Sequence, residues 1–211
     1  MVAHPHRGFV SALVLAAGES SRMGQLKALL PWYGRTLIEF QVETLLSSGV
    51  DQVIVVTGHR AEEVEDVLAE QPVEIVQNPD FLKGKTTSIK AGLRALDPRA
   101  QAILLLHVDQ PRPSQIVMRI IREHFEHDAL ITSPRFEGRG GHPVIFCINL
   151  LPELMAIDEV SQGLRAVYER HVNEINALPL KTPIVLLDMN TPPDYRKAID
   201  LFDSGPVRAL F

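Results

Sequence analysis

The chain has 211 residues, of which 45% are hydrophobic, a formal net charge of −5 and one cysteine, Cys147. This length and composition favour a single domain with an ample core, which we expect to span residues 9–205 between flexible termini at 1–8 and 206–211. The acidic balance argues against a nucleic-acid or membrane surface, and a lone cysteine excludes a disulfide framework or a cysteine-based metal site. Because no apolar run approaches the roughly 20 residues that cross a bilayer, and residues 1–7 lack a signal-like apolar core, we expect a cytoplasmic protein.

The first predicted element is a buried strand at residues 9–16, because an unbroken apolar run suits a strand covered on both faces of a sheet. Small and flexible residues follow, including Gly18 and Gly24, together with two cations, Arg22 and Lys27. Exposed backbone amides at the end of a strand, combined with cations, favour the binding of a polyphosphate. An ordinary strand-to-helix turn, with glycine at a positive φ and serine capping the next helix, is the alternative explanation.

The common phosphate-binding loops do not fit this chain. A Walker A loop needs glycine, four further residues and then Gly-Lys-Ser/Thr, but Met23 stands where the second glycine should follow Gly18. The other candidate, at residues 84–86, has Pro79 in place of the first glycine. The dinucleotide pattern Gly-x-Gly-x-x-Gly is absent as well, so a phosphate-loop ATPase is disfavoured.

Further along the chain, apolar runs predict strands and amphipathic patterns predict helices in alternation. The predicted strands cover residues 51–57, 73–76, 102–108, 129–133, 144–147 and 184–187, and the predicted helices cover 36–48, 61–70, 86–96, 114–127, 150–155, 161–174 and 194–202. This alternation predicts a three-layer α/β domain around a mostly parallel sheet with right-handed crossovers. Residues 129–149 interrupt the alternation, and we expect an antiparallel edge strand there.

Polar residues follow two of the predicted strands: Asp109 after residues 102–108, and Asp188 and Asn190 after residues 184–187. Ligands bind at the carboxyl ends of strands in open parallel sheets. Magnesium is the simplest reason for an aspartate at such a tip, because it takes carboxylate oxygens together with substrate phosphates. A plain Asp-x-Pro turn and, after Asn190, a helix cap are the alternatives.

The loop pattern Leu15-Ala16-Ala17-Gly18-x-Ser20-x-Arg22-Met23-Gly24-x-x-Lys27 resembles the nucleotide-binding loop of the MobA-like nucleotidyltransferases. The double alanine and Leu30-Pro31-Trp32 resemble the molybdenum cofactor cytidylyltransferase branch more than the guanylyl branch. Later elements are similar to the family in type and order, over about residues 10–202: Asn78-Pro79, Gly84 to Ser88, Ala91-Gly92-Leu93, Asp109-Gln110-Pro111, Gly141-His142-Pro143 and Asp188-Met189-Asn190-Thr191-Pro192.

The resemblance implies a Rossmann-like αβα sheet of the nucleotide-diphospho-sugar transferase fold, with a loop that wraps a nucleoside triphosphate. The nucleotide-binding residues it implies are Leu15, Ala16, Ala17, Gly18, Gly24, Lys27, Asn78, Gly84 and Ser88. It also implies three catalytic residues, Arg22, Lys27 and Asp109; a Mg²⁺ site at Asp109 and Asn190 with Asp188 nearby; and acceptor contacts from Gly141 and His142. From chemistry alone, a helix cap at Thr86 or Thr87 and a tight turn with His142 in solvent are equally open.

The activity implied by the resemblance is transfer of CMP from CTP to the phosphate of molybdenum-loaded molybdopterin, giving molybdopterin cytosine dinucleotide and pyrophosphate. A molybdoenzyme or its maturation chaperone is an implied partner. Val108 and Ser161 depart from the family pattern, which has a small residue and an acidic residue there, so GTP or a sugar or polyol phosphate acceptor stays open. A non-catalytic module that carries molybdenum cofactor is a further alternative, although Lys27 and Asp109 speak against it.

Overall fold

The structure, a computed structural model, describes residues 8–204. Apart from Gly8, the termini expected to be flexible lie outside the described residues, and the single-domain expectation stays a prediction. Within residues 8–204 no helix is long and apolar enough to cross a membrane.

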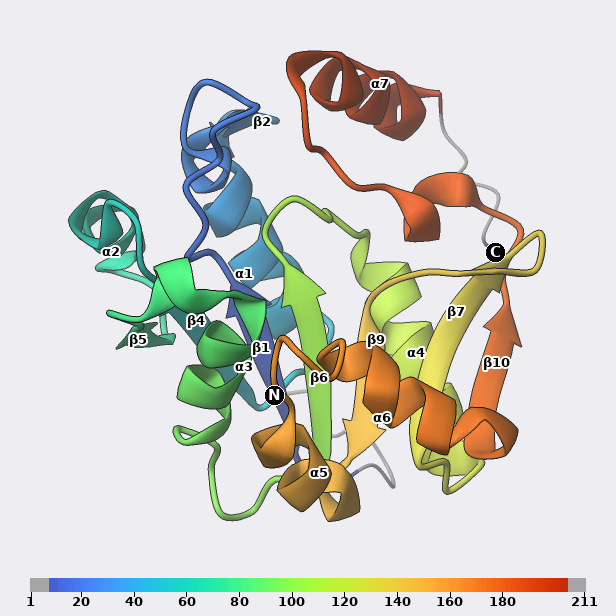
Figure 1. Cartoon of the computed structure of the whole chain (residues 1–211). Coiled ribbons are helices and arrows are strands. Elements are labelled where there is room, and N and C mark those ends of the chain that lie inside the picture. The colour runs from blue at the N-terminus through green and yellow to red at the C-terminus, as the bar shows by residue number, and fades with distance from the viewer. Residues whose placement is uncertain (1–7, 205–211) are drawn as a thin grey trace.

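A mostly parallel sheet forms the centre of the molecule, with the strand order β10-β7-β9-β6-β1-β4-β5 (Figure 1). The strands are β1 (Val10–Leu15), β4 (Gln52–Thr57), β5 (Glu74–Gln77), β6 (Ala102–His107), β7 (Ile131–Phe136), β9 (Val144–Cys147) and β10 (Ile175–Pro179), with the short β8 (Arg139–Gly140) beside β7. β1 lies at the heart of the sheet, where Leu13 pairs in parallel register with Ile54 of β4 and Leu105 of β6. The carboxyl ends of β1 and β6 therefore meet at one edge.

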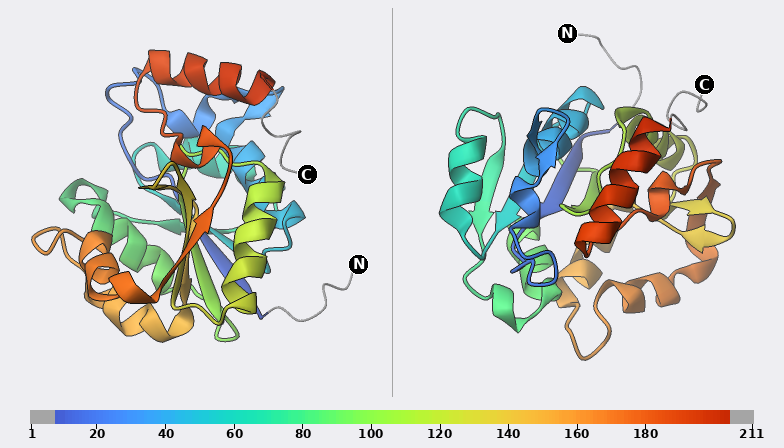
Figure 2. Two further views of the ribbon diagram at one scale, coloured as in Figure 1. Left: turned by 90° about the vertical axis from the view of Figure 1, so that its right-hand side faces the viewer. Right: turned by 90° about the horizontal axis from the view of Figure 1, so that it is seen from above.

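Helices cover both faces of this sheet, which confirms the three-layer α/β prediction (Figure 2). Ala12 and Val14 belong to the core under α1 (Leu37–Ser47), α2 (Ala61–Leu68), α4 (Ser114–Glu126) and α7 (Pro192–Asp203). Leu13 and Leu15 belong to the core under α3 (Lys85–Leu93), α5 (Leu151–Ala156) and α6 (Leu164–Arg170). Alternate residues of β1 thus serve opposite cores, and this is why its sequence is apolar without a break.

The last helix, α7, packs against a small hairpin that follows the glycine-containing loop after β1. The hairpin consists of β2 (Pro31–Trp32) and β3 (Arg35–Thr36), which are antiparallel. The ring of Trp32 packs against two rings of α7, with centroid distances of 6.1 Å to Tyr195 and 5.0 Å to Phe202. At the start of α7, Thr191 and Asp194 form a capping box, so the predicted cap is confirmed. This packing holds the residues just before α7 close to the loop.

Two sequence predictions about the sheet are wrong. The predicted strand at 184–187 is a 3₁₀ helix, Pro183–Leu186, because proline starts it and the Thr182 side chain caps the amide of Ile184. The apolar residues there are buried as expected, but by packing under β7 rather than by strand pairing. The antiparallel strand is β9, which lies inside the sheet, and the edge is formed by β10, which the sequence analysis missed.

The start of α3 also differs from the expectation. This helix begins at Lys85 with Gly84 as its N-cap, so neither Thr86 nor Thr87 caps it. Gly84 has a φ of 119°, and a Cβ there would lie 2.3 Å from a carboxylate oxygen of Glu159. Glycine is therefore favoured at this turn by its backbone angle, whereas the exposed Glu159 side chain could move to admit a Cβ. The remaining 3₁₀ turns are Lys27–Leu29, Phe81–Lys83, Ile148–Leu150 and Val172–Glu174.

Candidate active site

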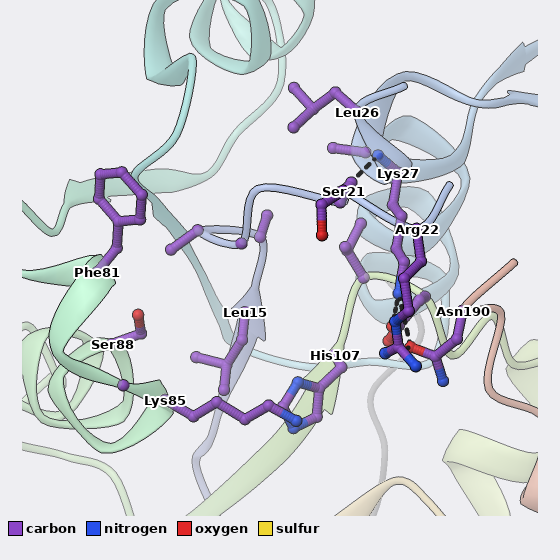
Figure 3. Close-up of a pocket in the computed structure, with 18 residues that line it drawn as sticks. Leu15, Ser21, Arg22, Leu26, Lys27, Phe81, Lys85, Ser88, His107 and Asn190 are labelled. Atoms are coloured by element: carbon purple, nitrogen blue, oxygen red, sulfur yellow. Dashed lines mark hydrogen bonds and ion pairs between the residues drawn. The ribbon is translucent and has the colours of Figure 1, made fainter. Parts of the chain in front are cut away.

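A pocket opens at the edge where β1 and β6 end, with a cavity volume of about 300 Å³ (Figure 3). Its walls come from the loop after β1, the start of α3, the end of β6 and the segment before α7. The lining residues are Leu15, Ala16, Ala17, Gly18, Ser20, Ser21, Arg22, Leu26, Lys27, Ala28, Phe81, Gly84, Lys85, Ser88, His107, Val108, Asp109 and Asn190.

The structure brings together the four charged and polar residues on which the sequence hypothesis depended most. Lys27 Nζ donates to Asp109 Oδ2 at 2.6 Å and to Asn190 Oδ1 at 3.0 Å. Arg22 Nη2 donates to the same Asn190 oxygen at 3.1 Å. The side chains of Lys27 and Asp109 are only 13% and 15% exposed, so their attraction is screened less than that of a surface pair. Two cations and one acid thus meet at the mouth of the β1 loop.

The loop is folded so that its cations face the pocket. Ser20 adopts a positive φ of 55°, and its Oγ accepts a hydrogen bond from the amide of Lys27 at 3.0 Å. Gly24 has a φ of 77° and is not among the lining residues, so its role in the structure is to turn the chain. The predicted contact of Gly24 with nucleotide therefore finds no support in this geometry.

The opposite wall contains Gly84 and Ser88, two of the residues expected to bind the nucleotide. Gly84 and Ser88 line the pocket, together with Phe81 and Lys85 of the same segment. Asn78 is buried behind this wall, where its amide donates to Ser88 Oγ and to Thr87 Oγ1, both at 2.9 Å. Asn78 therefore positions Ser88 instead of lining the pocket itself.

Asp188 completes an acidic pair beside the Lys27 contact. Burial, followed by the negative charge of Asp109, raises the pKa of Asp188. The amide of Met189 donates to the carbonyl of Asp109 at 3.0 Å, which fixes the segment after β6 beside the segment before α7. Two carboxylates and the Asn190 amide oxygen fit a divalent cation of the magnesium type, which would relieve the repulsion of the pair. The residues described contain no cluster of three His, Cys, Asp or Glu, and such a cation would complete its shell with water and phosphate.

Gly141 and His142 lie one layer behind the pocket. His142 Nδ1 meets Gln110 Nε2 at 3.3 Å, and its ring packs edge-on 6.1 Å from the ring of His107, which lines the pocket. His142 is half-buried by these contacts and does not lie free in solvent, and burial lowers the pKa of its ring to about 3. A Cβ on Gly141 would lie 2.4 Å from the carbonyl oxygen of Val185, and glycine is required there by close backbone packing.

A buried arginine that the sequence analysis missed connects three segments of the site. Arg112 is 0% exposed, and its hydrogen bonds with residues 8–204 all go to main-chain carbonyls. Its partners are the carbonyl oxygens of Pro111 (2.8 Å), His142 (2.8 Å), Val185 (3.0 Å) and Leu187 (2.9 Å). Burial lowers the pKa of Arg112 to about 9. No sequence motif indicates this role, because every residue has a main-chain carbonyl group that an arginine could bind.

Phe81, Lys85 and His107 are lining residues that the sequence analysis also missed as site residues. Lys85 could have been found from the sequence, because it is a cation that lies between Gly84 and Ser88, two residues expected to bind the nucleotide. Burial lowers the pKa of His107 to about 4, which keeps its ring neutral near pH 7.

A pocket at the carboxyl edge of a mostly parallel sheet, with the cations of the β1 loop beside Asp109 and Asp188, is the arrangement expected of an α/β nucleotidyltransferase. The chain belongs to the MobA-like NTP transferase family, whose domain model matches residues 12–175. Its fold is that of the nucleotide-diphospho-sugar transferases, and the protein is a transferase enzyme.

Individual relatives show how far this similarity extends. The chain is 28% identical to the molybdenum cofactor cytidylyltransferase of Escherichia coli, covering 88% of this chain and 93% of the relative. It is 33% identical to the nicotine blue oxidoreductase of Paenarthrobacter nicotinovorans, over 74% of this chain and 79% of the relative. The crystal structure of Rv0371c from Mycobacterium tuberculosis is 26% identical, covers 92% of this chain and 100% of that one, and superposes with a TM-score of 0.80. A manganese complex of the same protein superposes with a TM-score of 0.75 at 26% identity, covering 91% of this chain and 98% of that one.

Proposed function

We propose that this enzyme transfers CMP from CTP to the terminal phosphate of molybdenum-loaded molybdopterin, releasing pyrophosphate and forming molybdopterin cytosine dinucleotide. The observation that carries the proposal is the meeting of Arg22, Lys27, Asp109 and Asn190 in one pocket. The choice of CTP and molybdopterin is supported by the similarity to a cytidylyltransferase over nearly the whole length of both chains. The product would pass to a molybdoenzyme or its maturation chaperone.

In the proposed reaction the protein aligns its substrates and neutralises charge. The backbone of residues 15–18 and the wall formed by Gly84 and Ser88 bind the base and ribose. Arg22 and Lys27 neutralise charge on the β- and γ-phosphates, which depart as pyrophosphate. An acceptor phosphate is already ionised near pH 7, so it needs no general base. Asp109, Asn190 and Asp188 would hold a Mg²⁺ ion, which supplies further charge neutralisation at the triphosphate when bound.

The test is pyrophosphate release by the purified protein with molybdenum-loaded molybdopterin, a divalent cation and each of CTP, GTP, ATP and UTP. The proposal expects turnover with CTP at least tenfold above the other nucleotides. Preference for GTP would overturn the base assignment, and turnover only with a sugar or polyol phosphate would overturn the acceptor assignment.

One variant distinguishes the proposed enzyme from a non-catalytic carrier of molybdenum cofactor. Asp109→Ala should lose turnover and keep binding of nucleotide or pterin in a thermal-shift titration, because a ligand that binds only the native state raises the melting temperature. A matched control is Asp66→Asn, an exposed acid on α2. If the wild type releases no pyrophosphate and Asp109→Ala binds as the wild type does, the carrier explanation is correct.

A further inference from the structure

Lys85 is a cation in the pocket that has no partner among the described residues. Its side chain makes no hydrogen bond or ion pair with any residue of 8–204, although it lines the cavity. Figure 3 shows its side chain extending along the pocket toward His107. An exposed ammonium group directed along a binding cavity can reach an anionic ligand without first breaking another contact.

The main chain at Lys85 is held firmly, so its side chain starts from a fixed point. The preceding Gly84 is packed against Glu159, and the amide of Thr86 donates to Glu159 Oε1 at 2.7 Å. Thr86 itself is buried. Within this segment, the lysine side chain is therefore the part that a bound ligand would order.

The other two lining cations lie across the pocket and are already engaged. Arg22 and Lys27 contact Asn190, and Lys27 also contacts Asp109. In Figure 3 they stand on the far side of His107 from Lys85. The cavity therefore has a cationic group on each of two opposing walls.

We propose that Lys85 binds the attacking phosphate of the acceptor, while Arg22 and Lys27 bind the departing phosphates of the nucleotide. This inference rests on the proposed function. An acceptor phosphate oxygen forms a bond to the α-phosphorus with its own electron pair. The bond from the α-phosphorus to the α–β bridging oxygen breaks, and pyrophosphate leaves with that pair. In-line displacement puts the attacking phosphate and the departing pyrophosphate on opposite sides of the α-phosphorus. Cations on opposing walls of the pocket match this arrangement.

The direct test compares Lys85→Gln and Lys85→Arg with Lys83→Gln. Lys83 is a matched control because it lies two residues away, is 72% exposed, pairs with Asp80 at 2.8 Å and is not among the pocket-lining residues. Lys85→Gln should raise the KM for the acceptor by about 10- to 100-fold, the loss expected for one charged hydrogen bond. The affinity for CTP should change less than twofold, Lys85→Arg should recover most of the effect, and Lys83→Gln should behave as the wild type.

A second measurement decides the role of Lys85 without knowledge of the acceptor. Inorganic phosphate is titrated calorimetrically into the complex of the protein with a non-hydrolysable CTP analogue and Mg²⁺, and Lys85→Gln should weaken phosphate binding by at least tenfold. A parallel loss of CTP affinity would assign Lys85 to the nucleotide site and overturn the inference, as would a nucleotide complex of the wild type that binds no phosphate. If the wild type binds phosphate through Lys85 but transfers CMP to no acceptor, only the proposed function fails.

Discussion

Lys27 Nζ lies 2.6 Å from Asp109 Oδ2, although 82 residues separate the two in the chain. The contact joins the loop after β1 to the end of β6, two adjacent parallel strands. Lys27, which is expected to bind the phosphates, is therefore in direct contact with Asp109, which is expected to bind the metal ion. Substrate and metal binding at this position must therefore redistribute the contacts of both side chains.

The first prediction concerns the cation of this pair. Lys27→Met should lower turnover by about 10²- to 10³-fold, because it removes one preorganised electrostatic contact with the triphosphate. Steady-state kinetics with the best nucleotide of the panel measures the effect. Lys197→Met, an exposed lysine of α7, is the control and should retain wild-type kinetics. A Lys27→Met enzyme within threefold of the wild type would contradict the assignment.

The second prediction concerns the divalent cation. Removal by EDTA should abolish turnover, and Mg²⁺ or Mn²⁺ should restore it. Asp188→Asn should raise the metal concentration needed for half-maximal rate by about 10- to 100-fold, because this carboxylate supports the ligand set beside Asp109. Metal titrations of wild-type and variant activity test this, and an unchanged metal requirement would exclude Asp188 from the site.

The third prediction concerns the buried arginine that connects the site segments. Arg112→Met should lower the free energy of unfolding by about 3–5 kcal/mol, because it removes four buried hydrogen bonds and leaves the carbonyls of His142 and Leu187 without the donor that Arg112 supplies. Urea unfolding measures the change. Arg196→Met, on the exposed surface of α7, should stay within about 0.5 kcal/mol of the wild type. Equal stability of the two variants would show that the carbonyl contacts of Arg112 contribute little.

The fourth prediction concerns pH and His124, a buried residue of α4 whose Nδ1 lies 3.1 Å from Thr132 Oγ1. Burial lowers its pKa from 6.5 to about 4. The unfolded chain therefore binds a proton more readily than the folded one, and stability is lost as pH falls from about 6.5 toward 4. At pH 5 this loss is about 2 kcal/mol relative to pH 7.5.

The corresponding measurement is urea unfolding of wild-type protein and His124→Gln at pH 7.5 and pH 5. The variant should lose about 2 kcal/mol less than the wild type between these two values, since glutamine does not titrate. Identical pH dependence of the two proteins would show that His124 is not the group responsible.

Local features of the sequence were enough for much of the fold. The apolar run of residues 10–15 is typical of a strand that is covered on both faces, and these residues form β1. The capping pattern of Thr191 followed by Pro192 indicated the start of α7. The loop with Arg22 and Lys27, and the acid at the end of β6, were recognisable because a ligand site at a strand end needs particular residue types at fixed spacing.

Other features depended on partners distant in the chain. Residues 183–186 are apolar and would be buried in either a strand or a turn, so their apolar pattern alone did not distinguish the 3₁₀ helix that Pro183 and the Thr182 cap favour. That residues 175–179 form the edge strand was decided by pairing with β7. Arg112 binds main-chain carbonyls, which carry no residue identity, and Asn78 reaches Ser88 only after β5 and α3 have packed.

The sequence by itself therefore determined the layered α/β architecture, the phosphate-type loop and the acid at the end of β6, because each follows from residues within a few positions of one another. The tertiary structure decided the strand order, the support of the site by Arg112 and the position of Lys85 opposite the other two cations. These depend on contacts between segments many residues apart, and their geometry exists only once the two cores on either side of the sheet have formed.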